Sequence, residues 1–176
     1  MLIFDKTKSW KMQSAILDKC LPFLHSIGIP TIFGKIQTPT FLPGLQIEKG
    51  AIRIDKDALL HPGDILHEAG HLAVIPAADR ATRCQQTIET SPGREGEELM
   101  AIAWSYAACV HIGLDPHLVF HQDGYNGGGS NIVENFQAGR YFGTPLLQWC
   151  GMTLEPRHAT SDTPPPYPHM IRWLRE

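Results

Sequence analysis

His67-Glu68-Ala69-Gly70-His71 is the stretch from which the fold of this 176-residue chain can be worked out. Two histidines four residues apart lie one turn apart on the same face of an α-helix, so both imidazoles can hold one zinc ion. Glu68 follows the first histidine, where its carboxylate can reach a water molecule on that ion. Residues 65–66 and 72–75 are apolar and Pro76 follows, which predicts a buried helix.

Chance alone would seldom produce this motif in a chain of this composition. In a chain with nine histidines, and a similar number of glutamates, the pattern His-Glu-x-x-His is expected roughly 0.02 times at random. The competing interpretation is two core histidines that flank a surface glutamate. That interpretation requires polar groups to be satisfied inside an apolar helix, at a spacing that happens to suit a metal. The pattern therefore favours a zinc site.

Composition and charge describe an ordinary globular chain. Hydrophobic residues make up 43% and charged residues 19%, which predicts one domain over residues 1–176. The formal net charge of −3 gives no reason to expect a nucleic acid or an anionic membrane as a partner. No apolar run approaches the ~20 residues of a membrane span, and residues 1–6 lack a signal-peptide pattern. The four cysteines have neither the spacing of a zinc site nor that of a disulfide framework, so we expect a cytoplasmic protein. The sequence does not assign its oligomeric state.

A β-hairpin is predicted directly before the metal helix. Residues 45–48 and 51–55 alternate apolar and polar side chains around the turn Lys49-Gly50. A further short strand is expected at residues 31–33, within an otherwise irregular segment. An edge strand beside a zinc helix can pair with an extended peptide, although a small sheet that only covers the core explains the same pattern.

The segments on either side are less regular. A helix that starts at Ser9 is expected to kink or break early at Pro22, because a proline inside a helix removes a backbone hydrogen bond. Residues 77–96 are polar with few apolar anchors, and we interpret them as a surface loop. The glycine-rich residues 124–129 predict a further loop, at the rim of a cleft.

A second buried helix is predicted over residues 97–112, where almost every position is apolar or small. Gly113 is expected to end it. The Pro-rich tail, about residues 160–176, is expected to be extended, with Trp173 and Leu174 docking it on the rest of the protein.

This second helix supplies a candidate for the third ligand. Catalytic zinc sites use three protein ligands and keep a fourth position open, and no histidine follows His71 at the short spacing that would provide one. Glu98 heads the small, apolar face of the helix, where a buried carboxylate is costly unless a cation compensates it. Glu97 points about 100° away around the helix, and Glu95 lies between glycines. A solvated acidic first turn, favoured by the helix dipole, is the alternative for these glutamates.

The motif at residues 67–71, followed by Glu98, Ala101 and Trp104 on a second helix, resembles the Glu-zincin metallopeptidases, and within them the compact ImmA/IrrE-type peptidases. The resemblance covers roughly residues 44–112 and includes the strand pair before the motif. It implies an α+β, zincin-like fold in which several helices pack on a small, mostly antiparallel sheet. It also implies a zinc-dependent metallopeptidase that hydrolyses a peptide or protein substrate.

The resemblance also implies roles for individual residues. His67, His71 and Glu98 would bind Zn²⁺, and a water molecule activated by zinc would attack the peptide bond. Glu68 would be the catalytic general base, which takes the proton of that water and delivers it to the leaving amine. The sequence does not rank the donors that could stabilise the oxyanion, for which the candidates are Tyr106, His111, His121, Tyr125 and Tyr141.

Two alternatives to a peptidase are open at this point. A zincin-like regulatory or interaction module would bind metal without turnover and would not need Glu68. An ordinary interaction domain would need no metal. A second histidine pair, His117 and His121, has helical spacing but no acidic partner nearby, and ordinary histidines are expected there.

Overall fold

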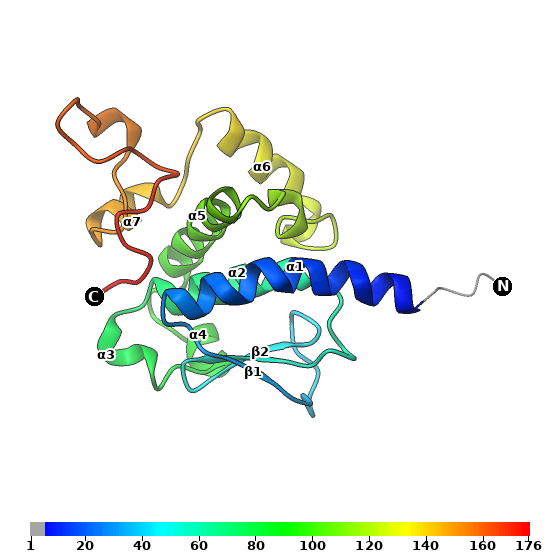
Figure 1. Cartoon of the computed structure of the whole chain (residues 1–176). Coiled ribbons are helices and arrows are strands. Elements are labelled where there is room, and N and C mark those ends of the chain that lie inside the picture. Colours follow the sequence, from blue (N-terminus) through cyan, green and yellow to red (C-terminus); the bar gives the residue numbers. More distant parts are fainter. Residues whose placement is uncertain (1–5) are drawn as a thin grey trace.

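Residues 6–176 are described by a computed structural model of the chain (Figure 1). In this range seven α-helices pack on a small three-stranded sheet, which is the expected α+β architecture. The elements are α1 (Lys6–Ser26), β1 (Thr31–Phe33), β2 (Leu45–Glu48), β3 (Ala51–Ile54), α2 (Ile65–Ala73), α3 (Ala77–Arg80), α4 (Gln85–Glu89), α5 (Arg94–Ile112), α6 (Gly129–Gln137) and α7 (Thr144–Trp149), with 3-10 turns η1 (Pro62–Asp64), η2 (Pro116–Leu118), η3 (Tyr125–Gly127) and η4 (Pro156–His158). Within residues 6–176 no helix is long and apolar enough to cross a membrane. The expectation about a signal peptide rests on residues 1–6, of which 1–5 lie outside the described range.

The sheet is mixed, with strand order β1-β3-β2. The predicted hairpin is confirmed: β2 and β3 pair antiparallel, and both turn residues, Lys49 (φ 49°) and Gly50 (φ 74°), adopt the left-handed backbone that a two-residue hairpin requires. The expectation of a mostly antiparallel sheet is wrong, because β1 pairs with β3 in parallel. The hairpin is determined locally by its turn, whereas the pairing of β1 depends on the path of the long segment that follows it.

The metal-motif helix α2 lies at the centre of the molecule. Figure 1 shows the sheet on one side of α1 and α2, and α5, α6 and α7 on the other. All residues of α2 except His67 are buried, as its apolar flanks predict. The predicted helix that carries Glu98 is also present, and its middle part, residues 100–109, is buried, but α5 begins at Arg94, three residues earlier than expected.

Two arginines hold the C-terminal end of α2 in place. The guanidinium of Arg80 donates hydrogen bonds to the carbonyl oxygens of Leu72 (2.9 Å) and Ile75 (3.1 Å). The backbone N–H of Arg175 donates to the carbonyl oxygen of Ala73 at 2.8 Å. The last carbonyls of a helix lack partners within the helix, so these contacts with α3 and the C-terminal tail satisfy groups that would otherwise be unpaired.

The Pro-rich tail packs against the body of the protein, as expected for Trp173 and Leu174. The Trp173 ring lies 4.8 Å from that of Phe23 and 5.5 Å from that of Trp104. The indole N–H of Trp104 donates to the carbonyl oxygen of Trp173 at 2.8 Å. The tail therefore helps to cover the helices that carry the motif.

Two local expectations are wrong. Residues 77–96 are not a plain loop, since they contain α3, α4 and the first turn of α5. These short helices bury few side chains and so lack a visible apolar period. The first helix neither begins at Ser9 nor breaks at Pro22: α1 runs continuously from Lys6 to Ser26.

Candidate metal centre

Helices α2 and α5 bring together three side chains that could bind one metal ion. His67 Nε2 and His71 Nε2 lie 3.1 Å apart. Glu98 Oε1 is 3.6 Å from His67 Nε2, and Glu98 Oε2 is 3.4 Å from His71 Nε2. These are the three candidate ligands that the sequence singles out. They form one of two groups within residues 6–176 whose donor atoms could hold a metal ion.

The separations suit a zinc ion. Zinc–nitrogen bonds of ~2.0–2.1 Å in tetrahedral geometry place two donor atoms roughly 3.3 Å apart. The observed separations, 3.1, 3.4 and 3.6 Å, lie on both sides of that value. Two imidazoles and one carboxylate are also a donor set that catalytic zinc accepts, with a fourth position left for water or substrate. The residues present therefore fit the ion that the motif implies.

Burial keeps both imidazoles in the form that a metal needs. The side chains of His67 and His71 are 11% and 10% exposed. Burial lowers the pKa of His67, against the opposing effect of Glu98. Burial lowers the pKa of His71 well below its usual range, and the positive charges of His67, Arg94 and Arg83 add to that effect. Because neutral imidazole is the form that binds metals, both side chains are suited to a cation at neutral pH.

The acidic side chains near the motif have different environments. Glu68 is buried on α2, with 3% of its surface exposed. Glu97 forms an ion pair with Arg83 at 3.1 Å, and Glu95 is exposed in the first turn of α5. Only Glu98, of the three glutamates at the start of α5, faces the histidines.

A close approach of two backbones sets the spacing of α2 and α5. A Cβ atom placed on Gly70 would lie 2.9 Å from the carbonyl oxygen of Ala101 and 3.2 Å from its Cβ. The hydroxyl of Ser105, one turn further along α5, donates to the carbonyl oxygen of Ala101 at 2.6 Å and lies 3.2 Å from that of Leu66 on α2. Glu98 precedes Ala101 by three residues, so this contact brings its carboxylate to the histidines.

Replacing Gly70 with alanine is expected to destabilise the protein by about 1–3 kcal/mol, the usual cost of overpacking. The new methyl group would meet the backbone of α5, so the helices must separate and Glu98 must move away from the histidines. Gly96→Ala on α5 is the matched control, because its Cβ would meet only Leu146 Cδ1, at 3.6 Å. Thermal unfolding measures both variants. A Gly70→Ala midpoint equal to that of the wild type would contradict this explanation of the helix spacing.

Tyr125 contacts the ring nitrogen of His67 that does not face His71 and Glu98. Its hydroxyl lies 3.1 Å from His67 Nδ1, while Nε2 of the same ring faces His71. Burial raises the pKa of Tyr125 well above its usual range, and the charges of Glu98, Asp64 and Glu68 add to the effect, so the hydroxyl stays protonated. A hydrogen bond at the second ring nitrogen fixes the orientation of a ligand histidine. Tyr125 is thus placed to position His67.

Three of the other candidates for an oxyanion donor lie elsewhere. The rings of Tyr106 and Tyr141 pack against Phe136, with centroids 4.9 and 5.6 Å away. The ring of His111 packs against Trp173 at 5.0 Å. In the described chain these side chains belong to aromatic packing away from the motif, and the sequence pattern carried no signal that separated them from Tyr125.

His121 does not form a pair with His117, because η2 ends at Leu118 and the two histidines do not share a helix. The expectation that His121 lacks an acidic partner is also wrong. Its Nε2 lies 2.9 Å from Oδ1 of Asp64, the residue directly before α2. Asp64 is 57 positions away in the sequence, so this contact depends on tertiary packing.

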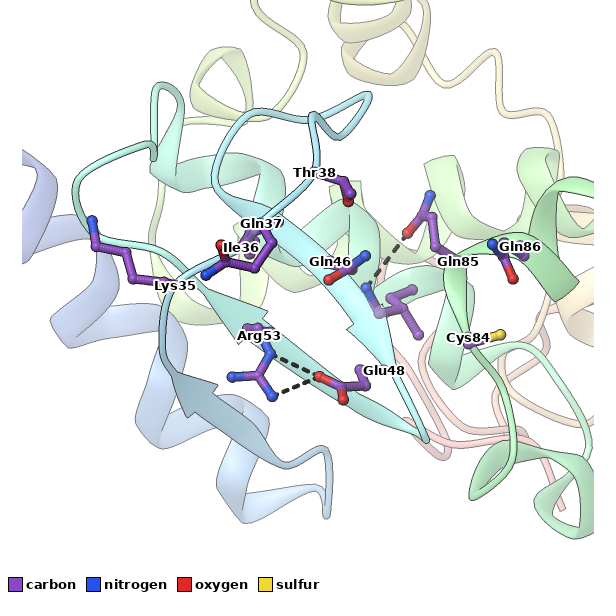
Figure 2. A pocket seen from close by; sticks show the side chains of 11 residues that line it. Lys35, Ile36, Gln37, Thr38, Gln46, Glu48, Arg53, Cys84, Gln85 and Gln86 are labelled. Carbon is purple, nitrogen blue, oxygen red and sulfur yellow. Dashed lines mark hydrogen bonds and ion pairs between the residues drawn. The ribbon is translucent and has the colours of Figure 1, made fainter.

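A groove runs along β2 on the side of the sheet that faces away from α2 (Figure 2). Gln46, Glu48 and Arg53 line it from the sheet, and Gln85 and Gln86 line it from α4, together with residues 35–38. The backbone N–H of Ile47 faces the groove and donates to Gln85 Oε1 at 3.5 Å. The groove contains none of the candidate ligands.

Comparisons of the chain with protein-family models, with curated proteins and with solved structures found no match. The functional interpretation therefore depends on the geometry of the site itself. Its central feature is three donor side chains, from two helices, within 3.1–3.6 Å of one another.

Proposed function

We propose that this chain is a zinc-dependent metallopeptidase with a zincin-like fold. The observation that carries the proposal is the convergence of His67, His71 and Glu98 at separations that suit tetrahedral zinc. The buried carboxylate of Glu68 on the same helix supports it, because a site that only stores metal needs no additional buried acid.

Each side chain has a chemical task in this proposal. His67, His71 and Glu98 would hold Zn²⁺, which when bound polarises a carbonyl group and lowers the pKa of water to ~7. Glu68 accepts a proton from the attacking water and delivers it to the leaving amine. Tyr125 keeps the imidazole of His67 in a fixed orientation through its hydrogen bond to Nδ1.

An extended peptide is the substrate class that we expect. Strand β2 is an edge strand and packs against α2, so a peptide paired with it would run beside the metal-motif helix. Part of this edge is already covered, since Ile47 N–H donates to Gln85, and in the adjoining turn Gly50 N–H donates to the carbonyl oxygen of Arg83. Strand addition therefore requires the Gln85 side chain to release the N–H of Ile47.

The test is hydrolysis of a peptide library by purified protein with bound metal measured in parallel. We expect zinc to co-purify, cleavage to stop when a chelator removes it, and cleavage to return when Zn²⁺ is added. A protein that binds zinc but cleaves no peptide in the library would instead favour the regulatory or interaction module. A protein that neither holds nor takes up zinc would rule out both the metallopeptidase and the metal-binding module.

A further inference from the structure

A second cluster of metal-binding side chains lies beside the N-terminal end of α2. One ring nitrogen each of His61 and His121 and a carboxylate oxygen of Asp123 lie within 4.8 Å of one another. The two imidazole rings are stacked, with centroids 3.7 Å apart. Asp123 Oδ2 lies 3.3 Å from His61 Nε2. This cluster shares no residue with the proposed catalytic centre.

Two buried nitrogen atoms of this cluster form no hydrogen bond, although one of them, His61 Nε2, lies 3.3 Å from Asp123 Oδ2. His61 Nε2 and His121 Nδ1 are both buried without a hydrogen bond. Buried polar atoms are paired in the great majority of cases, and an unpaired one calls for an explanation such as a missing ion. A cation bound to both His61 Nε2 and His121 Nδ1 would satisfy the two lone pairs at once.

Asp64 has the role that carboxylates commonly have next to metal-binding histidines. It is 4% exposed, burial raises the pKa of its carboxyl to about 7, and its Oδ1 lies 2.9 Å from His121 Nε2. A histidine that ligates a metal through one nitrogen usually donates its other N–H to a carboxylate in this way. The contact engages Nε2 and leaves Nδ1, the atom without a partner, as the ligand atom of His121. A nearby cation would also compensate the buried charge of Asp64.

We propose that His61, His121 and Asp123 form a second divalent-cation site, positioned by Asp64. Two imidazoles and a carboxylate are a donor set that suits zinc better than calcium or magnesium, which prefer oxygen ligands alone. One of the stacked rings must turn about its Cβ–Cγ bond for both lone pairs to point at one ion.

The cation at this site would be structural. It would join the segment before α2 to the loop that begins at His121, which are 60 positions apart in the sequence. Tyr125 belongs to the same loop and contacts His67 at 3.1 Å. A cation on Asp123 would therefore hold the loop that positions this ligand. The second site stands on its own residues and does not depend on the proposed peptidase activity.

The experiment counts Zn²⁺ bound to metal-free protein at equilibrium, by dialysis and elemental analysis. We expect two ions per wild-type chain, one in His121→Ala, and one in the double variant His67→Ala/His71→Ala. Asp123→Asn changes a side chain that is 76% exposed, so the variant should keep the fold. We expect it to lower the affinity for the second Zn²⁺ ion at least tenfold. His117→Ala, an exposed histidine on η2, is the matched control and should still bind two.

The stoichiometries separate the second site from the proposed catalytic centre. One ion per wild-type chain that is lost in His67→Ala/His71→Ala but kept in His121→Ala and Asp123→Asn would overturn the second site. One ion that is lost in His121→Ala but kept in the double variant would support it and count against the proposed catalytic centre. Circular dichroism of each variant confirms that a lost ion does not reflect a lost fold.

Discussion

Glu68→Gln is expected to abolish peptide hydrolysis while the protein retains its zinc. Glutamine has nearly the same shape as glutamate, so the buried position, 3% exposed, remains filled. Its amide cannot accept the proton of the attacking water, and loss of a general base typically costs ~10²–10⁴-fold in rate. The proposed metal donors are on His67, His71 and Glu98, and they are unchanged. Initial rates on the best library peptide, together with the zinc content, measure both effects.

The matched control for this variant is Glu134→Gln, which removes the same charge from an exposed position on α6. We expect this control to have wild-type rates and zinc content. Hydrolysis by Glu68→Gln at the wild-type rate, with zinc bound, would mean that another group accepts the proton. Loss of zinc in Glu68→Gln would mean that this carboxylate helps to hold the ion or the helix.

Glu98→Gln is expected to weaken zinc binding, and activity should fall with it. The change removes the negative charge that lies 3.6 and 3.4 Å from the two imidazoles. A neutral amide oxygen is a poor substitute for a carboxylate ligand of zinc. The loss of affinity should exceed the ~10–100-fold that follows when a hydrogen bond to a ligand is removed. Competition with a chelator of known affinity measures it.

Glu95→Gln provides the comparison for this second variant. It removes the same charge from the same first turn of α5, at an exposed position. Equal affinities for Glu98→Gln and Glu95→Gln would show that Glu98 is not a ligand. Together the two predictions separate the roles of the acids, because Glu68→Gln should lose turnover with zinc bound, whereas Glu98→Gln should regain part of its activity at high zinc.

Much of the local structure could be predicted from residue patterns. The hairpin followed from the alternation of residues 45–48 and 51–55 around Lys49-Gly50, and the second strand ends one residue earlier, at Ile54. The apolar neighbours of His67 and His71 predicted a buried α2. The sequence also singled out Glu98, which does lie near the histidines, but the reason was wrong: its side chain is 38% exposed, so it is not the buried carboxylate that was expected. Short helices such as α3 and α4 bury too little apolar surface to produce a recognisable period.

Periodicity and spacing are properties of neighbouring residues, so the sequence by itself determined which helix carries the histidines and which helix carries Glu98, the proposed third donor. Only the tertiary structure decided how close these helices come, through the contact between Gly70 and Ala101. It alone decided that Tyr125 meets His67, and that His61 stacks on His121. These last two contacts join residues about 60 positions apart. Their geometry depends on how the whole core packs, and no local pattern of residues records that packing.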